Sequence, residues 1–190
     1  MIAKNGVYAE DFVKFLHIAD PHLNSSTPCS RVDDYAETSV EKLHTLIDLM
    51  VERGLKALVM SGDVFHKNQQ SLIYLSKVFE AFVRMRNSGI RVYTNFGNHD
   101  LAFDKVENID KSPLWLLIQA GLIIPIGRLV LPNGVEIVGV HYPDEVEKAE
   151  KDNMICVCHR FFESSLHSKT YSEGELINLG YRMYLMGHDH

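Results

Sequence analysis

Apolar runs of strand length alternate along this chain with longer stretches in which apolar residues recur at helical spacing. Three of the runs, about Lys14–Ala19, Leu55–Met60 and Ile90–Asn95, predict β-strands. The stretches between them predict one helix that ends at Arg53 and a second helix over about Ser71–Asn87. Strands that alternate with helices are typical of parallel βαβ units. The first half of the chain therefore predicts an α/β fold.

Each of these two predicted helices has one apolar face and a glycine after its last turn. Gly54 follows the first helix and Gly89 follows the second, as is common at helix ends. We expect the apolar faces to be buried against the rest of the fold. They comprise Val40, Leu43, Ile47, Met50 and Val51 in the first helix, and Leu72, Leu75, Val78, Phe79, Phe82 and Val83 in the second.

The second half of the chain predicts further strands and one short helix. Ser112-Pro113 is a favoured helix start, and Gly121 ends this helix. Asn133-Gly134 is a strong turn dipeptide and predicts a hairpin over Leu129–Val140. Two more apolar runs predict strands: Met154–Cys158 and Arg182–Met186. Because no repeat or linker divides the sequence, residues 1–190 are expected to form a single domain, with residues 1–13 as a short leader.

The composition is that of an ordinary globular protein with an acidic balance. The 190 residues are 46% hydrophobic and 23% charged, and the formal net charge is -6. This charge argues against a protein whose surface is basic throughout. Any DNA-binding surface therefore has to be local, or a partner has to supply it. The N-terminus carries Glu10 and Asp11 and lacks a secretory signal. No run is long enough to span a membrane, so the expected location is cytoplasmic and no membrane partner is expected.

The three cysteines, Cys29, Cys156 and Cys158, do not form the pattern of a disulfide framework. Cys156 and Cys158 alternate along a predicted strand, so both face the same side of it. Their spacing also differs from the Cys-x-x-Cys geometry of a redox pair. We expect both to be small buried hydrophobic residues in a reducing cytosol.

Clusters of polar residues follow several of the apolar runs. In open α/β sheets the carboxyl ends of the strands form the ligand-binding edge, so these clusters are expected to converge on one crevice. Their glycines permit bends and a close approach of the backbone. In chain order the clusters are Asp20-Pro21-His22, Gly62-Asp63, Gly97-Asn98-His99-Asp100, His159 and Gly187-His188-Asp189-His190.

Seven side chains in these clusters are candidate metal ligands: Asp20, His22, Asp63, Asn98, His159, His188 and His190. Imidazole, carboxylate and amide donors without a thiolate suit Mn, Fe, Zn or similar ions. Asp63 directly follows a glycine and stands between the other groups in chain order, so it is our candidate for a bridging carboxylate. Two ions about 3.5–4 Å apart would polarise a phosphoryl group and lower the pKa of a bridging water.

The remaining histidines have simpler interpretations. His17 in a strand and His44 on a helix are expected to be structural, because a lone histidine in such a place is usually packed. His141 and His167 are expected to be structural or to lie on the surface. His66 lies in a loop next to the candidate site, and its role stays open.

The five clusters together resemble the signature of the calcineurin-like metallophosphoesterase superfamily. That signature is D-x-H, G-D, G-N-H-[DE], a single histidine and G-H-x-H, and all five blocks are present in order from Asp20 to His190. The resemblance implies a two-sheet β-sandwich flanked by helices, with the site at the carboxyl ends of the strands. It implies a phosphoesterase with two divalent ions, of which Mn is the expected metal and Fe, Zn and Mg are the alternatives.

The resemblance also implies a role for each candidate residue. One metal would take Asp20, His22, Asp63 and His190, and the other would take Asp63, Asn98, His159 and His188. A metal-bridging hydroxide would attack phosphorus in line with the leaving oxygen. His99 would lie beside the phosphate and protonate the leaving oxygen or stabilise the transition state. Asp100 would orient His99.

Within the superfamily, two stretches are similar to the SbcD-type DNA repair nucleases. One is Gly62-Asp63-Val64-Phe65-His66 followed by Ser71, and the other is Gly97–Asp100 followed by a helix and Ala120-Gly121-Leu122. Protein phosphatases of the superfamily carry Asp-Arg-Gly where this chain has Phe65-His66-Lys67. The likeness implies DNA as a partner and raises an SbcC-like SMC-type ATPase and a homodimer as further expectations. We expect residues 1–190 to lack the capping domain and the ATPase-binding segment of those nucleases.

The sequence leaves three functions open. The main hypothesis is a DNA nuclease, acting as an endonuclease or exonuclease. The alternative is a small phosphodiesterase or phosphatase for nucleotides or other small phosphoesters, which the acidic balance favours. A non-catalytic scaffold ranks last, because all seven ligands and His99 are present.

Two basic residues near the clusters are candidate substrate contacts. Arg160 directly follows His159, and Lys67 lies in a loop near the site, so both could touch a phosphate. A surface salt bridge is the alternative for Arg160. The neighbouring Phe161-Phe162 pair could stack on bases, but such a pair is more typical of a core.

Overall fold

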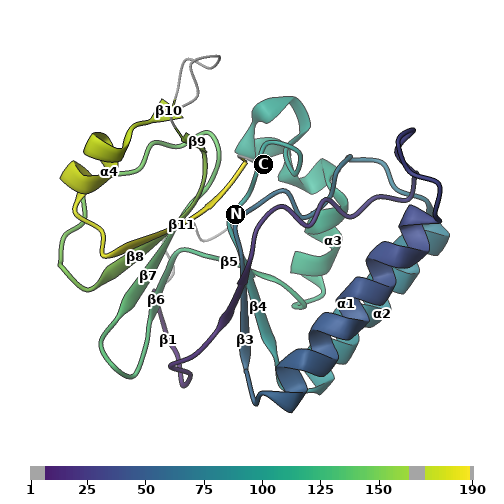
Figure 1. Ribbon diagram of the computed structural model, residues 1–190, viewed down its shortest axis with the longest axis horizontal. Helices are drawn as coiled ribbons and strands as arrows, with labels where there is room; N and C mark the ends of the chain where they lie inside the picture. Colours follow the sequence, from purple (N-terminus) through teal and green to yellow (C-terminus); the bar gives the residue numbers. More distant parts are fainter. Residues whose placement is uncertain (1–6, 163–169, 189–190) are drawn as a thin grey trace.

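Two β-sheets face each other and form the centre of the molecule (Figure 1). The computed structural model describes residues 7–162 and 170–188, so the expectations for His167 and His190 lie outside the described residues. The five-stranded sheet has the order β1 (Val7–Ala9), β6 (Arg128–Val130), β7 (Glu136–Val140), β8 (Met154–His159) and β11 (Met183–Gly187). The four-stranded sheet has the order β2 (Leu16–Ile18), β3 (Ala57–Met60), β4 (Arg91–Thr94) and β5 (Ile124–Pro125).

All neighbouring strands of the four-stranded sheet run parallel, as the alternation of strands and helices predicts. The five-stranded sheet contains one antiparallel pair, β6 with β7, which is the hairpin expected around Asn133-Gly134. A separate pair of short parallel strands, β9 (Phe161–Phe162) and β10 (Thr170–Tyr171), follows β8.

The helices begin where polar side chains cap their first turns. Asp34 caps α1 (Tyr35–Glu52), Ser71 caps α2 (Leu72–Asn87) and Ser112 caps α3 (Pro113–Gln119), each by accepting a backbone N–H of the first turn. These three helices pack on the side of the four-stranded sheet that faces away from the other sheet (Figure 1). A fourth helix, α4 (Glu173–Leu179), lies beside the five-stranded sheet, and two 3₁₀ helices, η1 (Ala102–Asp104) and η2 (Val106–Lys111), precede α3.

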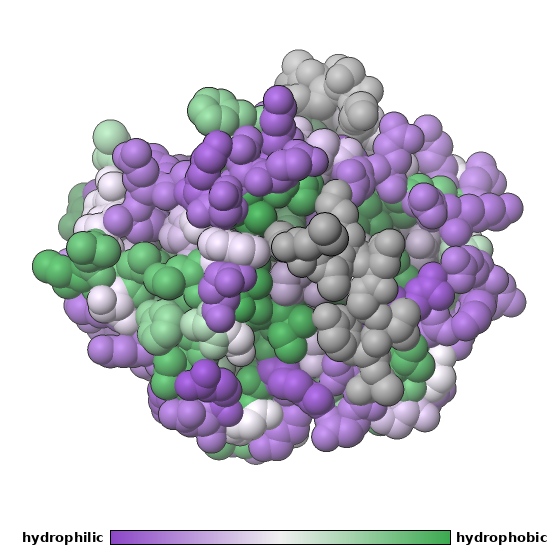
Figure 2. All heavy atoms as spheres, turned by 180° about the vertical axis from the view of Figure 1, so that it is seen from behind, coloured by the Kyte–Doolittle hydropathy of each residue, from purple (hydrophilic) through white to green (hydrophobic). Residues whose placement is uncertain are grey.

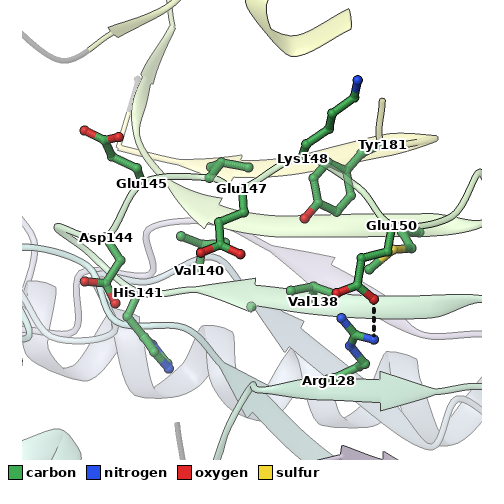
Figure 3. Close-up of a pocket in the computed structure, with 13 residues that line it drawn as sticks. Arg128, Val138, Val140, His141, Asp144, Glu145, Glu147, Lys148, Glu150 and Tyr181 are labelled. Atoms are coloured by element: carbon green, nitrogen blue, oxygen red, sulfur yellow. Dashed lines mark hydrogen bonds and ion pairs between the residues drawn. The ribbon is translucent and has the colours of Figure 1, made fainter. Parts of the chain in front are cut away.

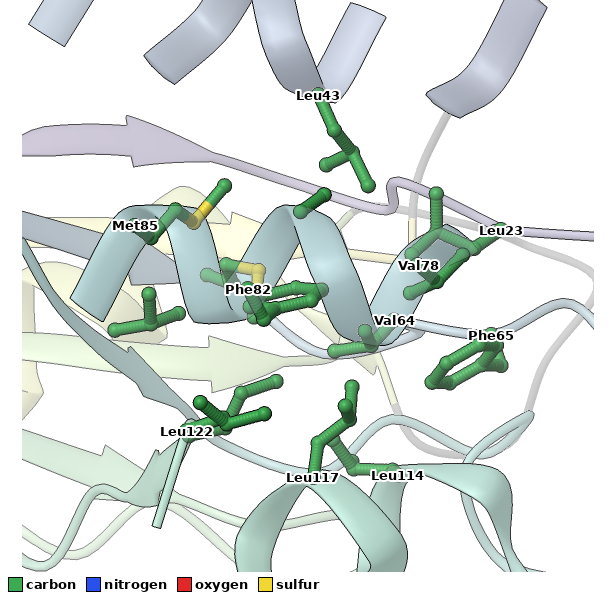
Figure 4. Close-up of a cluster of buried hydrophobic side chains, with 14 of the residues drawn as sticks. Leu23, Leu43, Val64, Phe65, Val78, Phe82, Met85, Leu114, Leu117 and Leu122 are labelled. Carbon is green, nitrogen blue, oxygen red and sulfur yellow. The ribbon is translucent and has the colours of Figure 1, made fainter. Parts of the chain in front are cut away.

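Alternate residues of β3 face two different apolar cores, one on each side of the four-stranded sheet. Leu58 and Met60 face the helices, whereas Ala57 and Val59 face the five-stranded sheet. On the helix side, α2 contributes Val78, Phe82 and Met85 to a cluster that α1, α3 and the loop after β3 complete (Figure 4). All four β3 residues are buried, so this strand holds both layers together.

Phe82→Ala should lower the free energy of unfolding by about 3–5 kcal/mol, because the substitution leaves a cavity in a close-packed core. Phe82 is 1% exposed and belongs to the helix-side cluster. Leu72→Ala on the same helix is the control, since Leu72 is 81% exposed and its loss should change stability by less than about 0.5 kcal/mol. Urea denaturation measures both values, and equal losses would contradict this description of the core.

The predicted strands and helices are confirmed with small differences at their ends, and two expectations about them are wrong. The segment expected to be a leader contains β1, which pairs in parallel with β6 through Tyr8 and Leu129. Val51 and Leu72, assigned to buried helix faces, are exposed, because they lie in the last and first turns of their helices, beyond the edge of the core.

The two alternating cysteines of β8 are buried, as expected. Cys156 and Cys158 are buried and free. On the reverse face of the molecule, patches of apolar side chains lie between hydrophilic ones (Figure 2). Within the described ranges, no helix is both long and apolar enough to cross a membrane.

Candidate metal centre and active site

The polar clusters of the sequence meet at the carboxyl ends of strands from both sheets. Asp20 follows β2, Asp63 follows β3 and Asn98 follows β4, all from the four-stranded sheet. His159 is the last residue of β8, and His188 comes directly after β11, both from the five-stranded sheet. The expected convergence on one edge is therefore what the structure shows.

Backbone strain is concentrated at this edge. In the described part of the chain, six residues other than glycine have positive φ, and four of them are candidate ligands. Asp20, His22, Asp63 and His188 have φ values of 48°, 43°, 46° and 91°. Such conformations cost about 1–3 kcal/mol each and cluster at functional sites, because the surrounding structure has to hold them in place.

Two glycines allow the strand ends to approach each other. A Cβ atom on Gly97 would overlap Oδ1 of Asp63, and a Cβ atom on Gly187 would overlap the carbonyl oxygen of Ser61. Neither position has room for a side chain larger than hydrogen. The close approach that these glycines were expected to permit is therefore present.

Gly97→Ala should weaken metal binding by at least about 10-fold, because the new methyl group must displace the Asp63 carboxylate. Gly174→Ala is the matched control, since a Cβ atom there meets nothing within 4 Å. Equilibrium dialysis with Mn²⁺ gives the number and affinity of bound ions for both variants. Wild-type affinity in Gly97→Ala would show that the carboxylate does not need its present position.

Asp63 lies at the centre of the cluster. The residue is 1% exposed, and its Oδ2 lies 3.2 Å from Nε2 of His159, 3.7 Å from Nε2 of His22 and 3.9 Å from Nε2 of His99. Burial alone would raise the pKa of this carboxyl, but the hydrogen bond and charge of His159 outweigh burial, so the pKa is lowered. Asp63 is therefore an anion surrounded by imidazoles from three different segments.

The first group of candidate ligands is Asp20, His22 and Asp63, whose donor atoms all lie within 4.8 Å of one another. The Asp20 carboxylate accepts the backbone N–H of His188 through both oxygens, at 3.1 and 3.0 Å. The backbone N–H of His22 donates to the Asp63 carbonyl at 3.0 Å, which fixes the loop after β2 against the loop after β3. His190, the expected fourth ligand of this group, lies outside the described residues.

The second group is Asp63, His159 and His188, also with donor atoms within 4.8 Å of one another. Nδ1 of His159 donates to the Ser61 carbonyl at 2.8 Å, so its Nε2 is the unprotonated nitrogen in the neutral ring. That Nε2 lies 3.1 Å from Oδ1 of Asn98, the expected amide ligand. Although burial alone would lower the pKa of His159, its contacts with Asp63 and Ser61 and the charge of Asp20 raise it.

These donor sets fit divalent metal ions. Both groups combine carboxylate and imidazole atoms at the strand ends, and the bond from His159 to Ser61 fixes which nitrogen of that ring faces the other donors. Nitrogen and oxygen ligands of this kind suit Mn, Fe or Zn. Backbone partners that orient metal-binding histidines are typical of such sites.

His99 is held in place by a partner that differs from the expected one. Its Nδ1 donates to the His66 carbonyl at 2.8 Å, while its backbone N–H donates to Oδ1 of Asp63 at 2.9 Å. Asp100 was expected to orient this ring, but its carboxylate accepts the backbone N–H groups of Phe65 and Gly97 instead. Asp100 therefore joins two loops of the site, and burial together with the charge of Asp63 raises the pKa of its carboxyl to about 7.

His66, whose role the sequence left open, belongs to the site. Its ring lies 5.2 Å from the ring of His22 and 5.0 Å from that of His99, so three imidazoles stand side by side. Burial, followed by the charge of His99, lowers the pKa of His66. The available signal was its position three residues after Asp63, in the same loop.

The two expected phosphate contacts have different surroundings. Lys67 is exposed in the loop after His66. Arg160 is 4% exposed, its Nη2 donates to the carbonyls of Pro143 and Asp144, and its Cζ lies 5.3 Å from the centre of the Tyr142 ring. Arg160 is therefore neither an open phosphate contact nor a surface salt bridge.

The other described histidines are structural, as expected. Nε2 of His17 lies 2.6 Å from the Ser61 hydroxyl, and His44 pairs with Arg84 on the helix surface. His141 is buried, stacks on Phe96 and accepts its backbone N–H at 3.0 Å.

A hollow of about 680 Å³ lies elsewhere, on the outer side of the five-stranded sheet (Figure 3). Its rim is mostly acidic, with Glu145, Glu147 and Glu150, and Arg128 pairs with Glu150 at 3.0 Å. None of its lining residues is a candidate ligand, so this hollow is separate from the metal centre.

Fold and site together define a metallophosphoesterase, and the family comparison agrees. The family model described as calcineurin-like phosphoesterase matches residues 13–190, so the chain belongs to this family. The chain therefore has the metallophosphoesterase fold, in a family that uses divalent metals. The crystal structure of TT1561 of Thermus thermophilus is similar, with a TM-score of 0.53 and 10% identity, and the match covers 93% of this chain and 81% of that one.

The curated relatives include DNA repair proteins and one metallophosphoesterase that is itself uncharacterized. A DNA double-strand break repair protein Mre11 from Methanocaldococcus jannaschii is 28% identical over 72% of this chain and 36% of its own length. The Mre11 of Methanococcus maripaludis is 26% identical over 74% of this chain and 40% of its own length. An uncharacterized metallophosphoesterase, YhaO of Bacillus subtilis, is 34% identical over 45% of this chain and 22% of its own length. The chain thus spans well under half the length of these relatives.

Proposed function

We propose that this chain is a phosphodiesterase that uses two divalent metal ions, Mn being the expected one, and cleaves DNA as an SbcD-type nuclease. The observation that carries the metal assignment is the position of Asp63, within reach of both groups of candidate ligands. Support for DNA comes from the relatives named as DNA double-strand break repair proteins. Two such ions, when bound, would polarise the phosphoester and supply a nucleophile from water.

The side chains of the site would bind the phosphate and transfer a proton to the leaving oxygen. His66 and His99 stack on each other beside the candidate ligands, and both imidazoles can donate hydrogen bonds to phosphate oxygens. Nδ1 of His99 stays bonded to the His66 carbonyl, which leaves Nε2 as the nitrogen that would pass a proton to the leaving oxygen. The exposed Lys67 could contact the next phosphate of a strand.

The test is cleavage of end-labelled single-stranded and double-stranded DNA beside a small chromogenic phosphodiester, with Mn²⁺ present. DNA cleavage that EDTA abolishes and Mn²⁺ restores best is the expected result. The His99→Ala variant controls for contaminating nucleases. Activity that survives prolonged chelation would overturn the two-metal proposal.

A second candidate is a small phosphodiesterase or phosphatase that acts on nucleotides or other small phosphoesters. The net charge of -6 favours it, because an acidic surface repels the DNA backbone outside the site. Hydrolysis of the chromogenic diester without cleavage of either DNA would select this function.

The proposed partners follow from the nuclease assignment. DNA is the proposed substrate, and an SbcC-like SMC-type ATPase and a second copy of the chain are proposed as protein partners. Sedimentation of the purified protein with and without a DNA duplex measures both the binding of the duplex and the self-association of the chain.

A further inference from the structure

Aromatic rings enclose His188, one of the candidate ligands, on several sides. Its imidazole centre lies 3.8 Å from the ring centre of Phe161 and 4.5 Å from that of His159. Tyr142 stands farther away, at 6.1 Å. These rings come from β8, from β9 and from the loop after β7, so the enclosure joins three segments.

His188 needs such support, because its own backbone does not favour its position. Its φ of 91° lies in a region that side chains other than glycine rarely adopt. Its backbone N–H is held by the Asp20 carboxylate, which fixes the main chain but leaves the ring to its neighbours. The rings around the imidazole therefore help to set its direction.

Arg160 connects the segments of this enclosure. Its backbone N–H donates to the Gly187 carbonyl at 3.2 Å, next to His188. Its guanidinium donates to the carbonyls of Pro143 and Asp144 and lies over the Tyr142 ring. The loop that carries Tyr142 is thus fastened to the end of β8 through this one side chain.

The burial of Arg160 is unfavourable for a group with so few partners. Among the described residues it makes no ion pair, and its Nε is buried without a hydrogen-bond acceptor. A buried cation lowers stability unless it is paired and fully bonded. The contacts with the loop are the feature that distinguishes the guanidinium from a hydrophobic side chain at this position.

We propose that Phe161 and Arg160 are positioning residues that set the imidazole of His188 for metal binding. The three consecutive residues of the segment 159–161 then have three different roles. His159 points into the centre, Arg160 points away and holds the Tyr142 loop, and Phe161 returns to pack on His188. The proposal rests on the metal assignment above and deepens it, because it names residues outside the ligand set that control one of the two ions.

The experiment uses Co²⁺ as the probe, since its visible absorption reports the ligand geometry of each ion. Phe161→Leu keeps an apolar side chain and removes the ring, and Arg160→Met keeps the stem and removes the donors. Phe162→Ala is the matched control, because Phe162 is the next residue of β9 and is 38% exposed. His188→Ala gives the reference absorption spectrum of a protein that lacks this ligand.

The expected result is a loss of affinity for one Co²⁺ of about 10–100-fold in Phe161→Leu and in Arg160→Met, as for other residues that orient a metal ligand. The second ion should keep its wild-type affinity, and the spectrum should shift towards that of His188→Ala. Phe161→Tyr, which restores a ring, should recover the wild-type spectrum. Phe162→Ala should match the wild type throughout.

Two other results would overturn the proposal. Unchanged affinity and spectrum in both variants would show that His188 needs no such support. Equal weakening of both ions, together with a lower melting temperature of the metal-free protein, would show a general structural role. If the wild-type chain itself binds fewer than two Co²⁺, the metal assignment fails rather than the positioning role.

Discussion

Replacing Asp63 with asparagine should remove both metal ions from the protein together. Asp63 stands within reach of imidazoles from both groups, and asparagine keeps its size while removing the negative charge. We expect the affinity for both ions to fall by more than about 100-fold, beyond the usual effect of losing a residue that only orients a ligand. Hydrolysis of a phosphodiester should be lost at the same time. Mass spectrometry of bound metal after dialysis measures the number of ions.

Asp20→Asn is the matched comparison, because Asp20 belongs to only one of the two groups. That variant should lose one ion and retain the other. Retention of one full ion in Asp63→Asn would contradict the bridging position of this carboxylate.

His99→Ala should retain both ions but lose most of its turnover. The ring is held by the His66 carbonyl rather than by a bond to a candidate ligand's side chain, and its side chain is 37% exposed, so substrate can reach it. General acid catalysis contributes about 10²–10⁴-fold, and kcat should fall by a factor in this range. Steady-state kinetics with a chromogenic diester, alongside a count of bound metal, measures both parts of the prediction.

His44→Ala is the control for this variant, because His44 lies on α1 and contacts Arg84 of α2 rather than a candidate ligand. An unchanged kcat in His99→Ala would refute its role in the chemical step. Loss of metal from His99→Ala would instead make it a ligand or a support for one.

The positions of Asp20, Asp63 and His188 could be predicted, because each of them comes shortly after an apolar run. Asp20, Asp63 and His188 come within three residues of a strand end, and parallel strands bring such ends to one edge. The role of the glycines was equally predictable, since a close approach of backbone to carboxylate leaves no room for a Cβ atom.

The partners of those residues were harder to predict. Asp100 follows His99 directly, yet its carboxylate bonds two backbone N–H groups, one of them from the distant Phe65. The hydrophobic periodicity of a sequence predicts strands and helices, but it does not predict which loops contact each other. For Arg160 a signal was available, because adjacent residues of a strand point to opposite faces and His159 already faces the site.

Short elements escaped prediction because they lack a periodic pattern. β1 has three residues and β5 has two, which is too few for an alternation to be visible. The helix α4 buries none of its residues, so it has no apolar face to detect. Its start could have been predicted nonetheless, since Ser172 and Glu175 form a capping box.

The hydrogen bonds from the His188 backbone to Asp20 join residues that are 168 positions apart in the chain. A nascent polypeptide on the ribosome therefore has Asp20, His22 and Asp63 outside the exit tunnel long before His188 has been translated. During that time one half of the centre lacks a ligand and the strained end of β11 does not yet exist. The candidate metal centre is thereby completed only when almost the whole of this segment has been synthesised.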